Sequence, residues 1–442
     1  MLCSDLPRGA GAPTLAARCA ALLAVLLLGT TSGCGDEAVP AGTRPDASPA
    51  QSGGRWLGTG EAEPSGDVAA RTAELESIGY LSGSRRAERP GGVQVLDPAR
   101  VQPGLNLVVS GHAPEAMLVS NEGRLLHRWT IACREAFPGV PPGDQPRFLY
   151  FRRARLLPNG DLLAIFEGTG IVRLRADSSL VWAWPGHAHH DLDVRPDGRI
   201  ITLARDVRSV PAIDPVNPIL VESVVELSPD GVELRRVGLL EALENTEGVE
   251  VADARLKAVL AETRGDVMHA NTARIVTQAC GGPLAPAQAG DVLVSLRSLG
   301  LIGVLDFEVG RFRWLRTGDW YGQHQPQLLP DGHVLLFDNG GGGASRSRVL
   351  EFDPETDEIT WQWSGTADDP LWSATCGSVQ RLPSGDTLIV ESDGGRALTV
   401  ASDGHIVWRF DSPWRTGLDD ELVATLFDVE RLPEDLPLTW LR

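Results

Sequence analysis

The stretch QHQPQLLPDGHVLLFDNGGGG runs from Gln323 to Gly343 and contains a histidine, an apolar run, a Pro-Asp-Gly turn, a second apolar run and a glycine-rich end. A turn tripeptide between two short apolar runs is typical of a β-hairpin. Both runs are apolar almost throughout, which indicates strands that are covered on both faces. The stretch therefore predicts a buried hairpin that begins at His324.

The same pattern recurs elsewhere in the chain. The matching stretches are RRARLLPNGDLLAIF from Arg152, HDLDVRPDGRIITLA from His190 and GSVQRLPSGDTLIVE from Gly377. Groups of short strands also end in aromatic strands after a polar turn, such as NEGRLLHRW ending at Trp129 and TDEITWQW ending at Trp363. Matching endings about 50 residues apart are typical of the four-stranded blades of a β-propeller.

We therefore predict an all-β fold, a six-bladed β-propeller. The repeat units begin near Asn106, Arg152, His190, His269, His324 and Gly377. The segment TLFDVERLPEDLP from Thr425 follows the last unit, and we expect it to complete the first blade and close the ring, which leaves no open sheet edge. The segment from Leu239 to Asp266 is rich in Ala, Leu and Glu, which predicts a helical insertion between blades three and four.

Residues 1–34 have the features of an export signal. Arg8 and Arg18 precede the apolar run CAALLAVLLLG, and small residues follow it. The run is too short to span a bilayer, which takes about 20 residues. The sequence TSGC resembles the lipobox of bacterial lipoproteins, in which the cysteine, here Cys34, becomes the lipidated first residue. The alternative is an ordinary cleaved signal peptide with a free Cys34 near the cut.

Two further parts complete the expected domain organisation. Residues 35–104 are rich in Gly, Ala, Pro, Ser and charged residues with little apolar periodicity, which predicts a flexible tether. Residues 105–442 are expected to form the propeller as a catalytic domain. We expect a periplasmic or otherwise extracytoplasmic protein that a lipid anchor holds to a bacterial membrane.

Composition argues against two other classes of protein. The formal net charge of -19 speaks against nucleic-acid binding, because neutralising phosphates requires an excess of Lys and Arg. The body of the chain contains Cys133, Cys280 and Cys376, an odd number that permits at most one disulfide without choosing the pair. No CxxC or Cys/His zinc spacing occurs, so no structural metal site is expected.

Histidine recurs at one position of the repeat. When the four hairpins are aligned on their turn prolines, the same starting position holds a histidine in two units, His190 and His324. In the other two units this position is Arg152 and Gly377. The fourth unit, HANTARI, begins with His269. In a closed ring these three imidazoles would face one end of the central channel.

An asparagine and an arginine accompany these histidines. Asn271 shares a strand face with His269, because side chains two residues apart point the same way. Arg297 lies in the expected next strand, and its guanidinium fits two oxygens at once; a salt bridge between blades is the alternative. Such a set suits sulfate or phosphate, with one imidazole as nucleophile or base. Zinc is the rival ligand of three imidazoles, but no carboxylate repeats alongside them, so we expect no metal.

Four ordered motifs resemble those of the bacterial arylsulfotransferases, which work without a phosphoadenosine donor. The motifs are HHDLDVRPDGRIITL, MHANTARI, LVSLR and QHQPQLLPDGHVLLFDNG, and the likeness spans roughly His189 to Phe410. The resemblance implies a six-bladed periplasmic propeller that moves a sulfuryl group from an aryl sulfate to a phenol by a ping-pong reaction. No nucleotide cofactor is implied, in agreement with the lack of a GxxxxGK[ST] loop.

The resemblance also implies roles for particular residues. His324 corresponds to the nucleophile that carries the sulfuryl group as a transient sulfohistidine. The residues that would hold sulfate oxygens and assist proton transfer are His269, Asn271, Arg297 and His190. His189 competes with His190 for its role, and the repeat register favours His190. Trp320 and Tyr321 are candidates to stack on a phenol ring, with packing of a blade end as the alternative.

Two other functions stay open. One is a non-catalytic, membrane-tethered propeller that acts as a binding or assembly module, and the other is a hydrolase that passes the sulfuryl group to water. The characterised arylsulfotransferases carry an N-terminal β domain, and the region before Leu105 is too polar and too short for one.

Overall fold

The computed structural model describes residues 85–140, 146–246, 256, 258–260, 263, 265–278, 287–341, 346–416 and 420–441. All of them belong to one compact unit. The expected signal peptide, Cys34 and most of the expected tether lie outside the described residues. Within the described part, no helix has both the length and the apolar character to cross a membrane.

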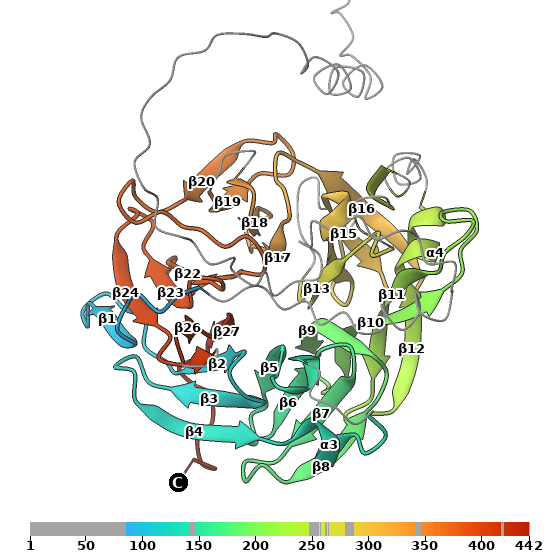
Figure 1. Cartoon of the computed structure of the whole chain (residues 1–442). Coiled ribbons are helices and arrows are strands. Elements are labelled where there is room, and N and C mark those ends of the chain that lie inside the picture. Colours follow the sequence, from blue (N-terminus) through green and yellow to red (C-terminus); the bar gives the residue numbers. More distant parts are fainter. Residues whose placement is uncertain are drawn as a thin grey trace, which may run out of the picture. The chain divides into compact units, whose positions relative to one another are not determined.

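Six antiparallel sheets of four or five strands surround a common centre (Figure 1), and β25 (Arg415–Thr416) and β26 (Leu422–Val423) form a further two-stranded sheet. From the inside outward, blade one contains β27 (Leu426–Arg431), β2 (Asn106–Ser110), β3 (Glu115–Val119) and β4 (Leu125–Thr130). Blade two contains β5 (Arg153–Leu156), β6 (Leu162–Phe166), β7 (Gly170–Leu174) and β8 (Leu180–Trp184). Blade three contains β9 (Ala188–Val194), β10 (Ile200–Arg208), β11 (Ile219–Leu227) and β12 (Glu233–Gly238).

The remaining blades follow the same order. Blade four contains β13 (Ala270–Ile275), β14 (Val292–Leu296), β15 (Leu301–Asp306) and β16 (Arg311–Thr317). Blade five contains β17 (His324–Leu328), β18 (Val334–Asp338), β19 (Arg348–Phe352) and β20 (Ile359–Trp363). Blade six contains β21 (Ser378–Arg381), β22 (Thr387–Glu391), β23 (Arg396–Val400) and β24 (Ile406–Asp411). The prediction of an all-β, six-bladed propeller is confirmed.

The C-terminal strand closes the ring. β27 pairs with β2, with Val429 opposite Val108, and the inner strands of successive blades contact one another around the centre. The prediction that the segment after Thr425 completes blade one is therefore confirmed. Because the sheet of blade one combines both ends of the propeller, its hydrogen bonds hold the ring shut.

Burial explains why the middle strands are apolar throughout. Every residue of β6, β18 and β22 is buried, since each of these strands has neighbouring blades against both faces. The outer strands β8 and β20 are mostly exposed or half-buried. The apolar runs of the repeated hairpin thus mark the second strand of each blade.

Tryptophans of the outer strands connect one blade to the next. The indole N–H of Trp129 in β4 donates to Gly160 O in blade two at 3.1 Å, and that of Trp182 in β8 donates to Pro229 O in blade three at 3.1 Å. Trp408 in β24 donates to Asn121 O in blade one at 2.8 Å. A buried indole needs such an acceptor, so the repeated aromatic endings stabilise the contacts between blades.

Ordered structure begins before the predicted domain boundary. Strand β1 (Gly92–Leu96) lies in the segment expected to be a tether, and it pairs with β24 as a fifth strand of blade six. Val93 and Leu96 pack against the apolar cluster that contains Trp408. The expected tether end at residue 104 is therefore corrected, because β1 covers the edge of β24 and belongs to the propeller.

Only part of the expected helical insertion is described. Helix α4 (Leu239–Glu244) follows β12, and its apolar residues are buried in the core cluster of blades three and four. Most residues between Thr246 and Gly265 lie outside the described residues. A helical insertion along the whole segment stays a prediction.

Candidate active site

Three histidines lie at the starts of neighbouring inner strands. His190 lies within β9, His269 directly precedes β13, and His324 begins β17. At each of these starts the register shifts by a β-bulge against the second strand of the blade. His190 and His269 adopt left-handed backbone conformations, with φ of 56° and 50°. Such bulges redirect side chains beside active sites, and here they occur where the repeat places its histidines.

The hydrogen bonds of His324 determine which ring nitrogen carries its proton. Nδ1 lies 2.8 Å from Gly322 O and 2.7 Å from Asn339 Oδ1. Both of these oxygens are acceptors, so Nδ1 carries the N–H and Nε2 carries the lone pair. The Asn339 amide is itself oriented, since its Nδ2 donates to Ser373 O at 2.9 Å and to Cys376 O at 2.7 Å.

The His324 imidazole is held in its neutral form. Burial lowers its pKa well below the usual value, and the positive charge of Arg297 lowers it further, against the opposing effect of the Asn339 hydrogen bond. Charges of His269 and Arg152 act in the same direction as Arg297. An imidazole with Nδ1–H and a free Nε2 lone pair is therefore present at neutral pH.

His269 forms a second oriented imidazole. Its Nδ1 lies 2.7 Å from Oδ2 of the buried Asp266, so the carboxylate faces Nδ1 and Nε2 is the ring nitrogen on the side away from it. Burial lowers the pKa of His269, while the charge of Asp266 raises it. The His269 ring meets the His190 ring edge to face at a centroid distance of 5.2 Å.

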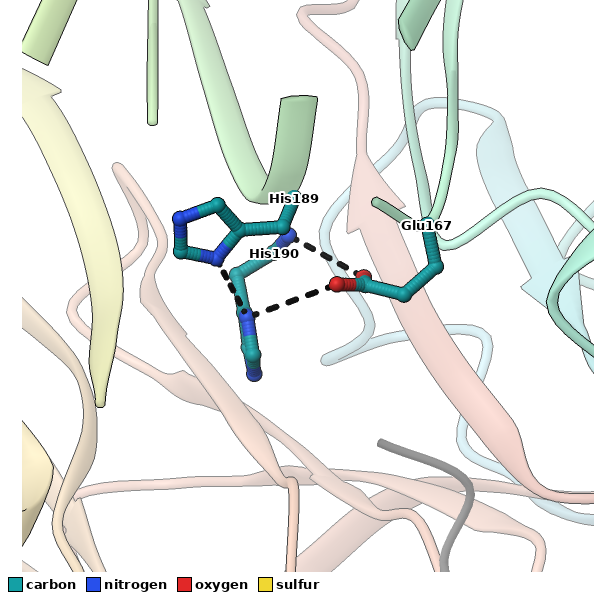
Figure 2. Close-up of side chains that lie close together, drawn as sticks. All are labelled: Glu167, His189 and His190. Carbon is teal, nitrogen blue, oxygen red and sulfur yellow. Dashed lines mark hydrogen bonds and ion pairs between the residues drawn. The ribbon is translucent and has the colours of Figure 1, made fainter. Parts of the chain in front are cut away.

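His189 and His190 differ in their surroundings. Nδ1 of His189 lies 2.9 Å from Nδ1 of His190, and the backbone N–H of His190 donates to Glu167 Oε2 at 3.2 Å (Figure 2). Burial lowers the pKa of His190 well below the usual value, followed by the charges of Arg152 and His269. The His190 ring thus contacts the ring of His269, whereas Nε2 of His189 lies 3.9 Å from Glu222 Oε1.

The same three residues are a conceivable cation site. Glu167, His189 and His190 offer ligand atoms within 4.8 Å of one another. Two cationic side chains border the carboxylate, since the charges of Arg205 and Arg152 lower the pKa of Glu167, which burial raises. Such neighbours disfavour a bound cation, and we assign no metal to this cluster.

Asn271 supports the segment that carries His324. The side chain is buried, and its Nδ2 donates to Gln323 O at 2.8 Å. The sequence predicts that Asn271 contacts sulfate oxygens, and the structure commits one of its two amide hydrogens to the backbone beside His324. Its immediate effect is therefore to join blade four to the start of β17.

Arg297 lies beside His324, and the part of the chain that the structure describes supplies no partner for its charge. It follows β14, and its backbone N–H donates to His269 O at 3.1 Å. The guanidinium approaches Gly322, where an added Cβ would lie 3.7 Å from both Nε and Nη2. Among the described residues its guanidinium forms no hydrogen bond or ion pair, so the alternative of a salt bridge between blades receives no support from this part of the chain.

The aromatic candidates separate into one packing residue and one exposed residue. The indole N–H of Trp320 donates to Gly300 O at 3.1 Å, and its ring packs against Phe352. Tyr321 is 72% exposed. Trp320 therefore packs a blade end, and Tyr321 is the one of the two that is accessible to a ligand.

A cavity lies at the other ends of the inner strands. It has a volume of about 300 Å³, and its lining includes Arg155, Arg274 and Glu430 but none of the site histidines. Asp191, one residue after His190, contacts Arg153 and Arg274 at 3.2 Å each. These ion pairs join the inner strands of blades two, three and four.

Two residues of this geometry were not found from the sequence. Asn339 was explained there by turn chemistry alone, although it closely follows Phe337, which pairs with His324 across β17 and β18. Asp266 precedes His269 by three residues, and this spacing alone carries no signal. Cys133 and Cys376 form no disulfide within the described part of the chain, and Cys280 lies outside the described residues.

A comparison with protein-family models finds one described as arylsulfotransferase (ASST), which matches residues 153–412. The match covers more than half of the chain and contains His190, His269, Asn271, Arg297 and His324. The chain belongs to the arylsulfotransferase family. The membership supports a sulfotransferase that acts on aryl compounds, and an aryl sulfate donor with a phenolic acceptor fits the family.

Other comparisons give more distant matches to this arylsulfotransferase. A protein of unknown function from Bacteroides caccae has 12% identity and a TM-score of 0.45, over 73% of this chain and 97% of that one. A streptogramin B lyase has 10% identity and a TM-score of 0.41, over 79% and 97%. The virginiamycin B lyase of Staphylococcus aureus has 12% identity and a TM-score of 0.34, over 59% and 69%. No curated protein matches significantly.

Proposed function

We propose that this arylsulfotransferase transfers a sulfuryl group from an aryl sulfate to a phenol in two half-reactions, with His324 as the nucleophile. The observation that carries the proposal is the pair of hydrogen bonds from Nδ1 of His324 to Gly322 O and Asn339 Oδ1. They leave the lone pair on Nε2, and burial with the charge of Arg297 keeps the ring neutral by lowering its pKa. A neutral imidazole in this tautomer is ready for nucleophilic attack.

In the first half-reaction, Nε2 of His324 attacks the sulfur of the aryl sulfate. The Nε2–S bond forms, the S–O bond to the aryl oxygen breaks, and its electron pair leaves with the phenolate. The imidazole becomes a cationic sulfohistidine. Its Nδ1–H keeps the two hydrogen bonds, and they strengthen as positive charge develops on the ring.

In the second half-reaction, the acceptor phenol attacks the sulfur from the side that the first phenolate left. The S–Nε2 bond breaks, and its electron pair returns to His324. His269 takes the phenolic proton on Nε2, and the carboxylate of Asp266 stabilises the imidazolium through Nδ1. The sulfuryl group is carried by a side chain, so the proposal requires no nucleotide cofactor.

Three further residues surround the sulfuryl group in this proposal. Arg297 neutralises its oxygens, because its guanidinium has no protein partner among the described residues and its charge acts on both His324 and His269. Asn271 holds the start of β17 and offers its second amide hydrogen. His190, which contacts the ring of His269, lies on the side of the departing aryl oxygen.

The test is a transfer assay with a chromogenic aryl sulfate and a phenol acceptor. The wild type should form the sulfated acceptor, and His324→Ala should lose the activity while keeping its fold. His405→Ala is the matched control, since His405 is exposed on an outer turn of blade six. Sulfate release that is independent of added phenol would identify a hydrolase. Folded wild-type protein that transfers from no donor in a broad panel would favour a binding module.

The proposed location rests on the N-terminal sequence. We propose that residues 1–34 direct export, that Cys34 carries a lipid anchor, and that the residues between Cys34 and Arg85 tether the propeller to a bacterial membrane outside the cytoplasm. The Cys34→Ser variant should lose the lipid mass and appear in the soluble fraction, and a membrane-bound variant would refute the anchor. We further propose a helical insertion over residues 239–266, which amide exchange would test.

A further inference from the structure

Arg152 occupies the position in blade two that His190 and His324 occupy in blades three and five. It directly precedes β5, and its backbone N–H donates to Ile165 O in β6 at 2.8 Å. Its side chain is 4% exposed, as deeply buried as the imidazole of His324. A permanent positive charge therefore lies in the same layer of the ring as the site histidines.

Within the described ranges, no oxygen acceptor lies at hydrogen-bond distance from the guanidinium of Arg152. Nε lies 3.7 Å from Glu167 Oε2, and Nη2 lies 3.7 Å from the Sγ of Cys376. The guanidinium carbon lies 4.9 Å from the centre of the Phe427 ring. Nε is buried and forms no hydrogen bond with the described residues. A guanidinium has five N–H donors, and a thiol is a weak acceptor for one of them.

Burial lowers the pKa of Arg152, but neighbouring groups, chiefly Cys376 and Glu167, raise it by more, so its charge is balanced while its hydrogen-bond donors are not matched. Removing a guanidinium from water is unfavourable when hydrogen bonds do not replace the lost hydration. Arg153 differs in its ion pairs, because its guanidinium contacts the carboxylates of both Asp191 and Asp428. By contrast, the Glu167 carboxylate lies 3.7 Å from Nε of Arg152. The open donors of Arg152 are therefore suited to an anionic oxygen that enters the site.

The position of Arg152 identifies which oxygen this is. Blades two and five are opposite in the ring (Figure 1), so the start of β5, which Arg152 precedes, lies across the centre from the start of β17. Arg297, on the adjacent blade four, lies on the same side as His324. In an in-line displacement the leaving oxygen lies on the side of sulfur that faces away from the nucleophile. For attack by His324 this side faces blade two.

We infer that Arg152 is a catalytic residue that binds the aryl oxygen of the donor and acceptor and stabilises it as a phenolate. The inference rests on the proposed function. It adds to that function a residue that is not needed to neutralise the sulfuryl oxygens. As the S–O bond of the donor breaks, its electron pair goes to the aryl oxygen, and the resulting anion pairs with Arg152. In the second half-reaction Arg152 lowers the pKa of the bound acceptor, and the phenolic proton passes to His269.

The neighbouring histidines make this cation necessary. His190 and His269 have pKa values below the usual value, in both cases chiefly because of burial, so neither supplies a positive charge to the leaving oxygen at neutral pH. They serve as proton acceptors instead. The permanently charged groups that act on His324 are Arg297 and Arg152, one for each side of the sulfur.

The direct test uses 4-nitrophenol, whose ionised form absorbs visible light, bound to His324→Ala. Since this variant cannot accept the sulfuryl group, binding is measured without turnover. Bound nitrophenol should have its pKa lowered by about one unit or more, and adding Arg152→Met should abolish this shift. Arg195→Met is the matched control, because Arg195 is a mostly buried arginine that pairs with Glu226 and Gly290 O. It should leave the shift intact.

A second test measures the dependence of sulfuryl transfer on the leaving group. Arg152→Met should lose roughly 100-fold in kcat/KM for donors with weakly acidic phenols and much less for nitrophenyl sulfate, and Arg152→Lys should recover part of the loss. Equal losses for all donors, or an unchanged nitrophenol pKa in Arg152→Met, would overturn the inference. If the wild type transfers nothing and yet shifts the nitrophenol pKa, the proposed function fails while the phenolate site stands.

Discussion

Oδ1 of Asn339 accepts a hydrogen bond from Nδ1 of His324 at 2.7 Å, and the amide nitrogen of the same residue donates to two backbone carbonyls of the loop before blade six. Asn339 follows the strand that pairs with β17, so the tautomer of His324 depends on the junction of blades five and six. The proton is held on the nitrogen that faces this junction, and the other nitrogen is left for chemistry.

Replacing Asn339 should impair transfer by releasing this tautomer. Asn339→Leu removes the acceptor at similar volume, so Nε2 of His324 gains a share of the proton and Nδ1 loses a partner for the cationic intermediate. We expect kcat to fall by about 10- to 100-fold, by analogy with the loss of an orienting acceptor in other catalytic histidines. Steady-state kinetics measure the fall, and nitrogen chemical shifts of labelled histidine report the tautomer. Unchanged kcat in a folded variant would contradict this role.

The activity should persist below neutral pH. The pKa of His324 is depressed by burial and by Arg297, and those of His190 and His269 are depressed chiefly by burial. Each imidazole must be neutral to act as nucleophile or base, so activity is lost only as the pH falls through these depressed values. The acidic limb of the kcat/KM profile should therefore lie below about pH 6.5, the ordinary histidine value. A limb centred above pH 7 would show that the essential imidazoles are not desolvated.

The buried neutral state of His324 should also reduce stability in acid. Below about pH 6.5 the unfolded chain binds a proton at this histidine and the folded chain does not, so the free energy of unfolding decreases as the pH falls. The loss is at most about 1.4 kcal/mol per pH unit for one group and ends at the depressed folded pKa. His324→Gln removes the pH dependence of stability that comes from His324. It keeps the pH dependence that comes from the neighbouring carboxyl groups.

Urea unfolding of wild type and His324→Gln between pH 7 and pH 5 measures this difference. The stability of the wild type relative to the variant should decline steadily over the range. A difference that is constant with pH would mean that His324 titrates alike in the folded and unfolded states.

Asp266 should matter most when the acceptor phenol is weakly acidic. Asp266→Asn keeps a hydrogen bond to Nδ1 of His269 but removes the charge that raises the pKa of His269. Proton removal from the acceptor should become limiting, with a loss of about 10-fold or more for weakly acidic phenols and little change for strongly acidic ones. Transfer rates from one donor to a series of phenols of different acidity would measure this loss. An equal loss in the first half-reaction would instead indicate a structural effect.

The repeat makes most of the fold predictable from the sequence. The turn prolines and the apolar second strands show where each blade begins, and the segment after Thr425 could be assigned because the first unit lacks its own hairpin. Strand β1 could not, since Gly92–Leu96 is a five-residue strand inside a polar region and is recognisable only by its pairing with β24. The strand is stabilised by pairing with β24, which is far away in the sequence. The local sequence carries no signal for this pairing.

The site was predictable to the extent that it follows the repeat. His190 and His324 share a register, and the structure places the corresponding starts of blades three, four and five side by side. Asn339 and Asp266 do not recur at a repeat position, and their importance arises from side-chain directions that the bulged backbone sets. The sequence places Arg152 at the histidine position of the repeat. Its distances to Glu167 and Cys376, which show that its N–H donors have few acceptors among the described residues, are known only from the fold.

The central claim is that His324 carries the sulfuryl group, and the most direct measurement is the mass of the protein after incubation with an aryl sulfate and no acceptor. The account predicts a gain of one sulfuryl group on the peptide that contains His324, its loss on addition of a phenol, and no gain in His324→Ala. A protein that transfers sulfuryl groups while this peptide stays unmodified, or that is modified at another residue, would contradict it.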